Sequence, residues 1–448
     1  MIKERHALTA IVIALFAYVL VIRTYDVSST FLMLGEQTRD WTVALGSITD
    51  LPLVGAPSTA GGRGFGPSYY WVLWIGRIVL GPFMDNLPHA GGVTVAVIQS
   101  IADVVLFIAL SRRVHWSLAL AICLLIASAP FDIAISSVIW NPPVSEAFIK
   151  IAIATALKLT PASPWWQVAV AAAFAWMGVQ AHLSAIFVAA PLLAALALQS
   201  FVERPQNLRR TVVERAGVVL ATVFFLQIPF LLSIFKEPHA PVGPSSAIAS
   251  LTHPKVFRPW FAYWSVTGIT GNLVWPMWDA FEYAIPTAIV VLIVAIVYRK
   301  DLVLIAVTAG AVVMATLLFT TSTRNFDGYW FLTLTPALTL AFGMAVAAIP
   351  SKTAVKVIGI ALLLLVAWRQ PARIEDSKRF FKYPQYEAML KGSRSAVEQA
   401  PVVKDIKVAF DVHPTMDRQF IYKILGGRID GSALYTAVIN SDGSMRLQ

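Results

Sequence analysis

Charged side chains are scarce in this 448-residue chain. Asp, Glu, Lys and Arg together make up 13% of it, against roughly 25% in a typical soluble domain, while hydrophobic residues make up 57%. A chain with so little charge cannot cover its surface with groups that water solvates, so lipid must solvate most of it. The composition therefore predicts an integral membrane protein rather than a soluble one.

Cysteine, nucleotide motifs and metal motifs are nearly or wholly missing. The single cysteine, Cys123, stands in the apolar run AICLLIA, so no internal disulfide forms and the thiol is expected to be buried and inert. There is no Walker motif and no Gly-x-Gly-x-x-Gly after a strand, which speaks against direct use of a nucleotide. No His, Asp or Glu cluster has metal-ligand spacing, so no cofactor is assigned, and a divalent metal would need ligands that only folding brings together. The histidines concerned are His89, His182, His239, His253 and His413.

The net charge of +10 is not gathered in one patch of the kind that binds nucleic acid. Basic residues instead recur in short clusters between apolar runs, a pattern that reports membrane topology. Eleven runs are long enough to cross a bilayer if tilt is allowed. They cover residues 8–22, 91–110, 116–131, 144–159, 167–180, 184–199, 216–235, 284–298, 302–319, 329–349 and 354–368.

The basic clusters set the orientation of these spans. No small-residue cleavage site follows the first run, so we expect a retained span and a cytoplasmic N-terminus. The clusters that then fall on the cytoplasmic side are Arg112/Arg113, Lys158, Arg204/Arg209/Arg210/Arg215, Arg299/Lys300 and Lys352/Lys356, whereas three short outer turns carry only Arg324.

This topology divides the chain. We expect a transmembrane domain over 1–368, with outer loops at 23–90 and 236–283, and a small extracytoplasmic α/β domain over 369–448. Residues 66–83 are apolar and aromatic, but as a span they would turn Arg112 and Arg113 outward, so we expect an interfacial helix on the outer leaflet. The tail has a helix-like pattern at 386–398 and strand-like patterns at 406–410 and 433–439.

Five short motifs follow one another along the membrane part of the chain: GEQTRDW at 35–41, the Pro/Gly-rich stretch at 51–71, IWNPP at 139–143, QAH at 180–182 and STRNFDGYW at 322–330. Together they resemble bacterial GT-C glycosyltransferases of the aminoarabinose-transferase and protein-mannosyltransferase kind. The resemblance implies an all-α polytopic membrane enzyme. It also implies transfer of a sugar from a polyprenyl-phosphate donor to a lipid, glycan or protein acceptor, on the outer side of the cytoplasmic membrane.

The resemblance also points to a catalytic carboxylate. In the family it opens the first outer loop, usually in an Asp-Glu or Asp-Gln pair, and Glu36-Gln37 falls at that position, which leaves open whether Glu36 or Asp40 reacts. Independently, moving a sugar from phosphate to a hydroxyl needs a base for the acceptor proton and positive charge for the leaving phosphate. We predict that Glu36 is the base and that Asp40, one helical turn on, orients Arg39 or the acceptor. The alternative is a solvated ion cluster of these three residues.

Outer-facing basic residues are candidates for binding the donor phosphate. Arg324 precedes Tyr329 and resembles the Arg/His-Tyr segment of the family near that phosphate, with an interfacial anchor as the alternative. Arg63, Lys255 and Arg258 are further candidates, with lipid headgroup contact as the alternative. The residues expected to line the substrate cavity are Arg39, Tyr69, Tyr70, Trp140, Asn141, Gln180, His182 and Tyr329.

Polar residues at membrane depth support a competing interpretation. Asp103 is expected to form hydrogen bonds between helices as a protonated acid, and Glu146 and Lys150, four residues apart, to neutralise each other. The same residues would suit the substrate path of a transporter or flippase, although no internal repeat is apparent. A glycan polymerase or ligase would share the topology and differ in its donor.

Overall fold

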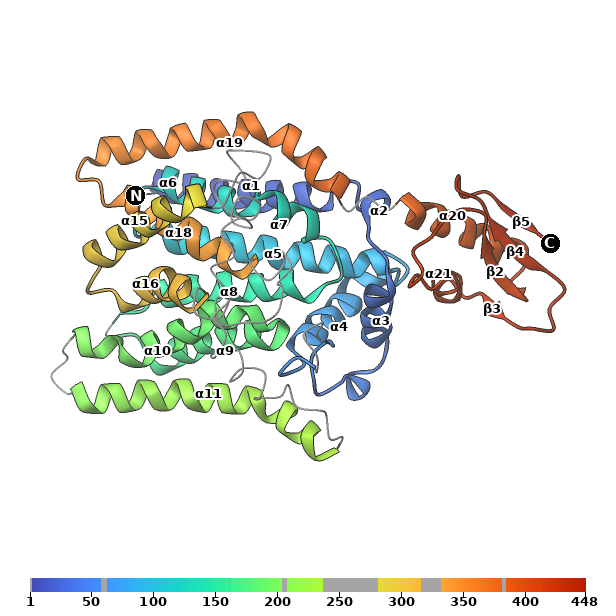
Figure 1. The fold of residues 1–448 in the computed structure, drawn as a ribbon, viewed down its shortest axis with the longest axis horizontal. Coiled ribbons are helices and arrows are strands. Elements are labelled where there is room, and N and C mark those ends of the chain that lie inside the picture. The colour runs from blue at the N-terminus through green and yellow to red at the C-terminus, as the bar shows by residue number, and fades with distance from the viewer. Residues whose placement is uncertain are drawn as a thin grey trace.

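A computed structural model describes residues 2–57, 63–160, 162–203, 208–236, 281–315, 332–380 and 384–448. Figure 1 shows long helices side by side in a bundle, with α3 and α4 at one end and the strands of the C-terminal segment beyond them. The helices of the bundle are α1 (Ile2–Thr24), α5 (Pro88–Leu110), α6 (Trp116–Ala127), α7 (Pro130–Ile135), α8 (Asn141–Leu157), α9 (Trp165–Ala181), α10 (Ile186–Glu203), α11 (Leu208–Lys236), α15 (Phe281–Val297), α16 (Leu302–Ile305) with a π-helical continuation, α18 (Thr335–Ala347) and α19 (Lys352–Phe380).

Five helices of the described ranges are long and apolar enough to cross a membrane: His6–Ser29, Pro88–Leu110, Leu183–Val202, Leu208–Phe235 and Lys352–Pro371. Other helices of the bundle are apolar but shorter, such as Trp116–Ala127 and Leu302–Ala315. The multi-pass membrane class is thus supported, while the count of eleven spans stays a prediction. Residues 66–83 contain α4 (Ser68–Leu80), which is not among the five long helices.

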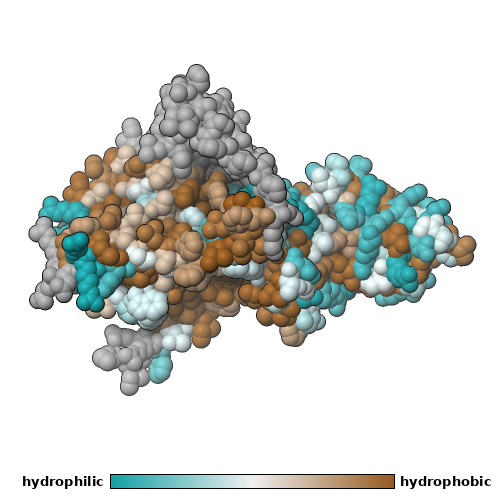
Figure 2. All heavy atoms as spheres, turned by 90° about the horizontal axis from the view of Figure 1, so that it is seen from below, coloured by the Kyte–Doolittle hydropathy of each residue, from teal (hydrophilic) through white to brown (hydrophobic). Residues whose placement is uncertain are grey.

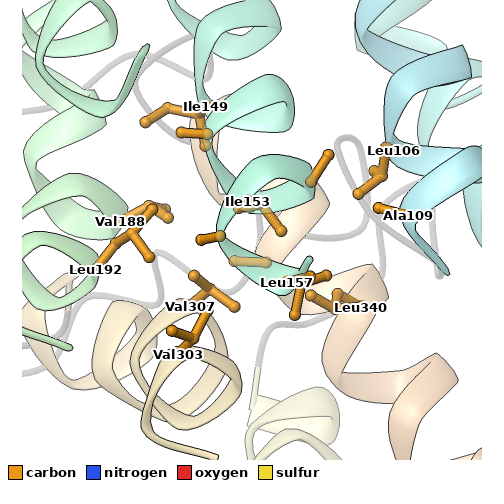
Figure 3. Close-up of a cluster of buried hydrophobic side chains, with 14 of the residues drawn as sticks. Leu106, Ala109, Ile149, Ile153, Leu157, Val188, Leu192, Val303, Val307 and Leu340 are labelled. Atoms are coloured by element: carbon orange, nitrogen blue, oxygen red, sulfur yellow. The ribbon is translucent and has the colours of Figure 1, made fainter. Parts of the chain in front are cut away.

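Helix α8 is the centre of the bundle. Nearly all of its side chains are buried, and α5 and α9 pack along it. A proline in the first turn starts α5, α7, α8 and α18, where its missing N–H costs nothing. Figure 3 shows the apolar contact of Ile149, Ile153 and Leu157 of α8 with Leu106, Ala109, Val188, Leu192, Val303, Val307 and Leu340 of its neighbours.

Peripheral helices show the opposite pattern. Large apolar side chains on α1, α11 and α19 are exposed, among them Ile13 (64%), Phe225 (67%) and Leu364 (67%). Figure 2 shows the bundle as mostly hydrophobic on the face in view and the C-terminal segment as mostly hydrophilic. Such a surface suits lipid around the bundle and water around the C-terminal segment.

A cluster of charges crosses the interior where four helices meet. The Arg23 guanidinium of α1 lies 2.7 Å from Asp103 on α5 and 2.9 Å from Asp132 on α7, and Lys150 of α8 lies 2.9 Å from Asp103 and 3.2 Å from Glu146. All five side chains are fully buried. The expected Glu146–Lys150 pair is therefore present. Asp103, expected to form hydrogen bonds between helices as a protonated acid, does contact two other helices, at ion-pair distance from Arg23 and Lys150.

The C-terminal unit, residues 384–448, begins with α20 (Pro384–Gln399) and includes α21 (Phe420–Ile424). Strands β2 (Asp405–Val408) and β4 (Thr436–Ile439) pair in parallel, and β5 (Met445–Leu447) joins β4 antiparallel. A separate parallel pair consists of β1 (Val402–Val403) and β3 (Arg428–Ile429). A helix and strands thus lie where the tail patterns predicted them.

Candidate functional site

Helix α3 (Gly35–Leu45) carries both candidate carboxylates across the end of the bundle, beside α4. One face of α3 is buried and includes Asp40 and Trp41. The Trp41 ring is fully buried, and its Nε1 donates a hydrogen bond of 2.8 Å to the carbonyl of Asn86 before α5. The anchored indole fixes α3 against the bundle, so the helix can present its other face in a defined direction.

Asp40 is the buried carboxylate of the pair. Its side chain is 2% exposed, and it accepts hydrogen bonds from Arg39 Nε (2.8 Å), Tyr69 Oη (3.1 Å) and Tyr70 Oη (3.0 Å). Burial raises the pKa of Asp40 above its usual range, and the hydrogen bonds from Arg39 and the two tyrosines oppose that shift. With its oxygens taken by three donors, Asp40 is arranged to hold its neighbours in place.

The two tyrosines come from the first turn of α4, which brings their hydroxyls together on one carboxylate. Their rings are 5.3 Å apart between centroids. Burial and the Asp40 charge raise the pKa of both Tyr69 and Tyr70, so their hydroxyls stay protonated and act as donors. The structure thus brings together Arg39, Asp40, Tyr69 and Tyr70, and the two tyrosine hydroxyls face a carboxylate.

Arg39 and Glu36 are the accessible members of the cluster. Arg39 keeps 39% of its side chain exposed while its Nε holds Asp40, and Glu36 is exposed one turn earlier on α3. Burial lowers the pKa of Arg39, but the hydrogen bond and charge of Asp40, with smaller contributions from Tyr70 and Glu36, raise it above its usual value. Arg39 therefore lies within the electrostatic reach of both carboxylates and stays charged.

The Pro/Gly-rich loop brings a second arginine near this cluster. Backbone bonds from Gly55 N to Gly64 O (3.0 Å) and from Gly64 N to Ala56 O (3.1 Å) close the loop. Arg63 is exposed, and its charge is the smallest of the contributions to the pKa of Tyr70, where it opposes the rise caused by burial and Asp40. Arg63 therefore interacts electrostatically with Tyr70, one of the residues that contact Asp40.

Glycine is required where this loop meets the bundle. A Cβ on Gly66 would lie 2.4 Å from the Gln180 side chain at the end of α9. Gln180 in turn donates to the Leu226 carbonyl of α11 at 2.6 Å, and Gln227 donates to the Phe65 carbonyl at 3.0 Å. The loop is thus clamped between α9 and α11.

The other candidate cavity residues form contacts between helix ends. Asn141 Nδ2 donates to the Ala181 carbonyl at 2.9 Å, and the buried His182 places Nδ1 2.7 Å from Ser184 Oγ. Trp140, directly before α8, is partly exposed and packs with Leu332. These contacts join the helix ends next to Gln180, the residue that touches the Pro/Gly-rich loop. The remaining candidates lie outside the described residues: Arg324, Tyr329, Lys255 and Arg258.

Within the described ranges, no group of three or more His, Cys, Asp or Glu side chains is arranged to hold a metal ion. Two contributors to this region escaped the sequence analysis. Asp132 pairs with Arg23 at the C-terminal end of α1, and Thr415 of the C-terminal unit contacts Gly35 at the start of α3. Neither has a local sequence signal, because each partner is more than a hundred residues away.

No protein-family model and no curated protein sequence matches this chain. Among solved structures it is similar to ArnT from Cupriavidus metallidurans in the apo state, with a TM-score of 0.58 at 13% identity over 96% of this chain and 93% of that one. ArnT bound to undecaprenyl phosphate aligns with a TM-score of 0.52 at 14% identity, over 97% and 93%. Arabinofuranosyltransferase AftD from Mycobacteria aligns with a TM-score of 0.43, too low to support an argument. The chain has the fold of ArnT, in agreement with the all-α polytopic fold that the resemblance implied.

Proposed function

We propose that this chain is a membrane glycosyltransferase that moves a sugar from a polyprenyl-phosphate donor to a lipid, glycan or protein acceptor. The observation that carries the proposal is the ArnT fold over 96% of the chain, together with the undecaprenyl phosphate bound in one of the two similar structures. A lipid-linked donor keeps its phosphate at headgroup depth. Helix α3 lies at one end of the bundle, the position from which a side chain would meet such a phosphate.

In this reaction Glu36 accepts the proton of the acceptor hydroxyl. The acceptor oxygen bonds to the anomeric carbon, and the bond from that carbon to the phosphate oxygen breaks, so the polyprenyl phosphate leaves with the electron pair. Glu36 suits the role because its carboxylate is exposed, whereas the oxygens of Asp40 already accept from three donors. The geometry supports the predicted division of roles, with Asp40 orienting Arg39.

Positive charge for the leaving phosphate comes from arginine side chains near Asp40. Arg39 is held by Asp40 yet remains accessible, and Arg63 lies on the loop clamped against α9 and α11. Preorganised cations of this kind stabilise charge that develops on the leaving oxygen. We keep Arg324, Lys255 and Arg258 as further candidates for this role.

The distribution of charge supports a site on the outer side of the bacterial cytoplasmic membrane. At the opposite end of the bundle, a cavity of about 170 Å³ is lined by Arg113, Arg215 and Lys300, and Arg113 pairs there with Asp301. Cytoplasmic ends of membrane helices carry such an excess of Lys and Arg. The end with α3 then faces outward.

The charges at membrane depth do not favour a transporter. Asp103, Glu146 and Lys150 are fully buried and pair with one another or with Arg23, so within the described part of the bundle their charges are matched by protein partners. A glycan polymerase or ligase differs in using an oligosaccharide donor. A panel that contains both donor types separates it from a transferase of single sugars.

The test is to incubate the purified protein with polyprenyl-phosphate sugars and polyprenyl-linked oligosaccharides and to measure transfer. For the donor that is used, Glu36→Gln should lower turnover about 10²- to 10⁴-fold with donor binding retained, because the amide cannot accept the proton. Glu387→Gln, a matched change of an exposed carboxylate on α20, should leave turnover intact. Transfer from none of the donors, or full activity of folded Glu36→Gln, would overturn the proposal.

A further inference from the structure

Helix α3 supplies one capping contact of its own, because the Gln37 side chain accepts from the backbone N–H of Leu34 at 3.0 Å, but the residue before the helix offers no side-chain cap. The preceding residue is Leu34, which has no side-chain oxygen, and the first bond within the helix runs from Thr38 N to Leu34 O. The first backbone N–H groups of a helix have no acceptor inside it, so they need partners from outside. The N–H of Gly35 finds one in Thr415 Oγ1 at 3.2 Å, a residue 380 positions further along the chain.

The Thr415 hydroxyl is held for this contact. It lies 2.8 Å from His413 Nδ1, and the Thr415 backbone N–H donates to the same nitrogen at 3.3 Å. The hydroxyl can therefore accept from Gly35 N while donating to His413. Glycine allows the approach, because a Cβ on Gly35 would lie 3.0 Å from the Thr415 carbonyl oxygen and 3.1 Å from its Cβ.

A larger interface fixes this contact in position. The ring of Phe31, just before α3, lies 4.9 Å from Tyr386 of α20, whose hydroxyl is 2.7 Å from His89 Nδ1 at the start of α5. Phe31, Tyr386, Met416 and Tyr70 belong to one continuous buried cluster. The C-terminal unit thus shares a core with the site instead of hanging from a linker, and the position of Thr415 is defined relative to α3.

We propose that the C-terminal unit completes the site by capping α3 across the chain, with Thr415 as a positioning residue for Glu36. Glu36 directly follows Gly35 in the first turn, so a frayed turn would let its carboxylate leave the reacting geometry. The inference rests on the proposed function for what Glu36 does, but the cap itself is a property of the fold. It assigns a role in the reaction to a unit that lies beyond the bundle.

Amide hydrogen exchange tests the cap without any substrate. Thr415→Val keeps the shape and removes the acceptor, Thr415→Ser keeps the acceptor, and Thr436→Val makes the same change in β4, away from α3. An N-cap is worth about 0.5 to 2 kcal/mol, so exchange of amides 35–38 should rise roughly 2- to 30-fold in Thr415→Val alone. Unchanged exchange in Thr415→Val, or an equal rise in Thr436→Val, would overturn the cap.

Steady-state transfer tests the positioning role. In Thr415→Val, kcat should fall by up to roughly 30-fold with the donor KM unchanged, and Thr415→Ser should restore it. A faster-exchanging first turn with wild-type kcat would overturn the positioning role and leave a structural cap. If the wild-type protein transfers no sugar, the proposed function fails, and the exchange measurement still decides the cap.

Discussion

Replacing Asp40 should separate the stability of the site from its activity. In Asp40→Ala, three donors lose their acceptor: Arg39 Nε and the hydroxyls of Tyr69 and Tyr70. Each buried tyrosine hydroxyl counts for about 1 kcal/mol, and Arg39 for no more, since its exposed part is solvated by water. The alanine variant should therefore lose about 3 kcal/mol of unfolding free energy.

Asp40→Asn should cost much less. Asparagine has nearly the same shape and keeps one acceptor oxygen, and it removes a charge whose burial is unfavourable, as the raised pKa of Asp40 indicates. We expect a loss within about 1 kcal/mol. Turnover, by contrast, should fall roughly 10- to 100-fold, because a neutral amide no longer fixes the Arg39 guanidinium.

The pH dependence has a defined sign. Because burial raises the pKa of Asp40 above 3.8, the folded protein binds this proton more tightly than the unfolded chain does. The stability that the group contributes relative to asparagine is full below the unfolded value and is lost as pH rises through the raised folded value. The wild-type protein should therefore lose stability relative to Asp40→Asn from about pH 4 upward.

The measurements are thermal unfolding in detergent micelles, followed by tryptophan fluorescence from pH 4 to 8, and sugar transfer at fixed pH. Asparagine as destabilising as alanine would mean that the charge itself holds α3 and α4 together. Wild-type turnover in Asp40→Asn would mean that Arg39 needs no partner. Either result would refute the reasoning.

Three further outcomes are expected. Arg23→Met leaves two buried carboxylates without their guanidinium and should cost about 3 to 5 kcal/mol, seen as a loss of folded, monodisperse protein; normal recovery would contradict this. Gly66→Ala forces a methyl against Gln180 and should cost about 1 to 3 kcal/mol in a melt, partly restored by Gln180→Ala; an unchanged melting temperature argues against the clamp. In a Cys123→Ser background, Ser432→Cys should react with an impermeant maleimide from outside intact cells, and labelling only after opening the inner side would reverse the topology.

The parts that were predictable from sequence depend on local patterns. Apolar runs located the helices of the bundle, and the spacing of Glu146 and Lys150 predicted an ion pair that lies at 3.2 Å. The need to keep Arg112 and Arg113 on the cytoplasmic side kept residues 66–83 out of the predicted spans. Likewise, alternating apolar residues located β2 and β4 in the C-terminal unit.

The rest depends on tertiary contacts that no local pattern encodes. Glu36 and Asp40 share a helix face, yet only Asp40 is buried, because Glu36 lies in the first turn, where side chains point back past the start of the helix. Sequence alone also could not find the partner of Arg23 at Asp132, since α7 is a six-residue helix with no periodicity to read. The same holds for Thr415 and Gly35.

The hydrogen bond between Gly35 and Thr415 can form only late in synthesis of the chain. Helix α3 is among the first parts to be synthesised, but its acceptor follows 380 residues later. At about 5 to 20 residues per second, that interval is roughly 20 to 80 s on the ribosome. Throughout it, the first turn of α3 lacks the Thr415 contact, and for most of it Phe31 lacks Tyr386. A nascent chain therefore carries its predicted base on an unfinished helix, and any product cut short before Thr415 would keep the membrane bundle without a finished site.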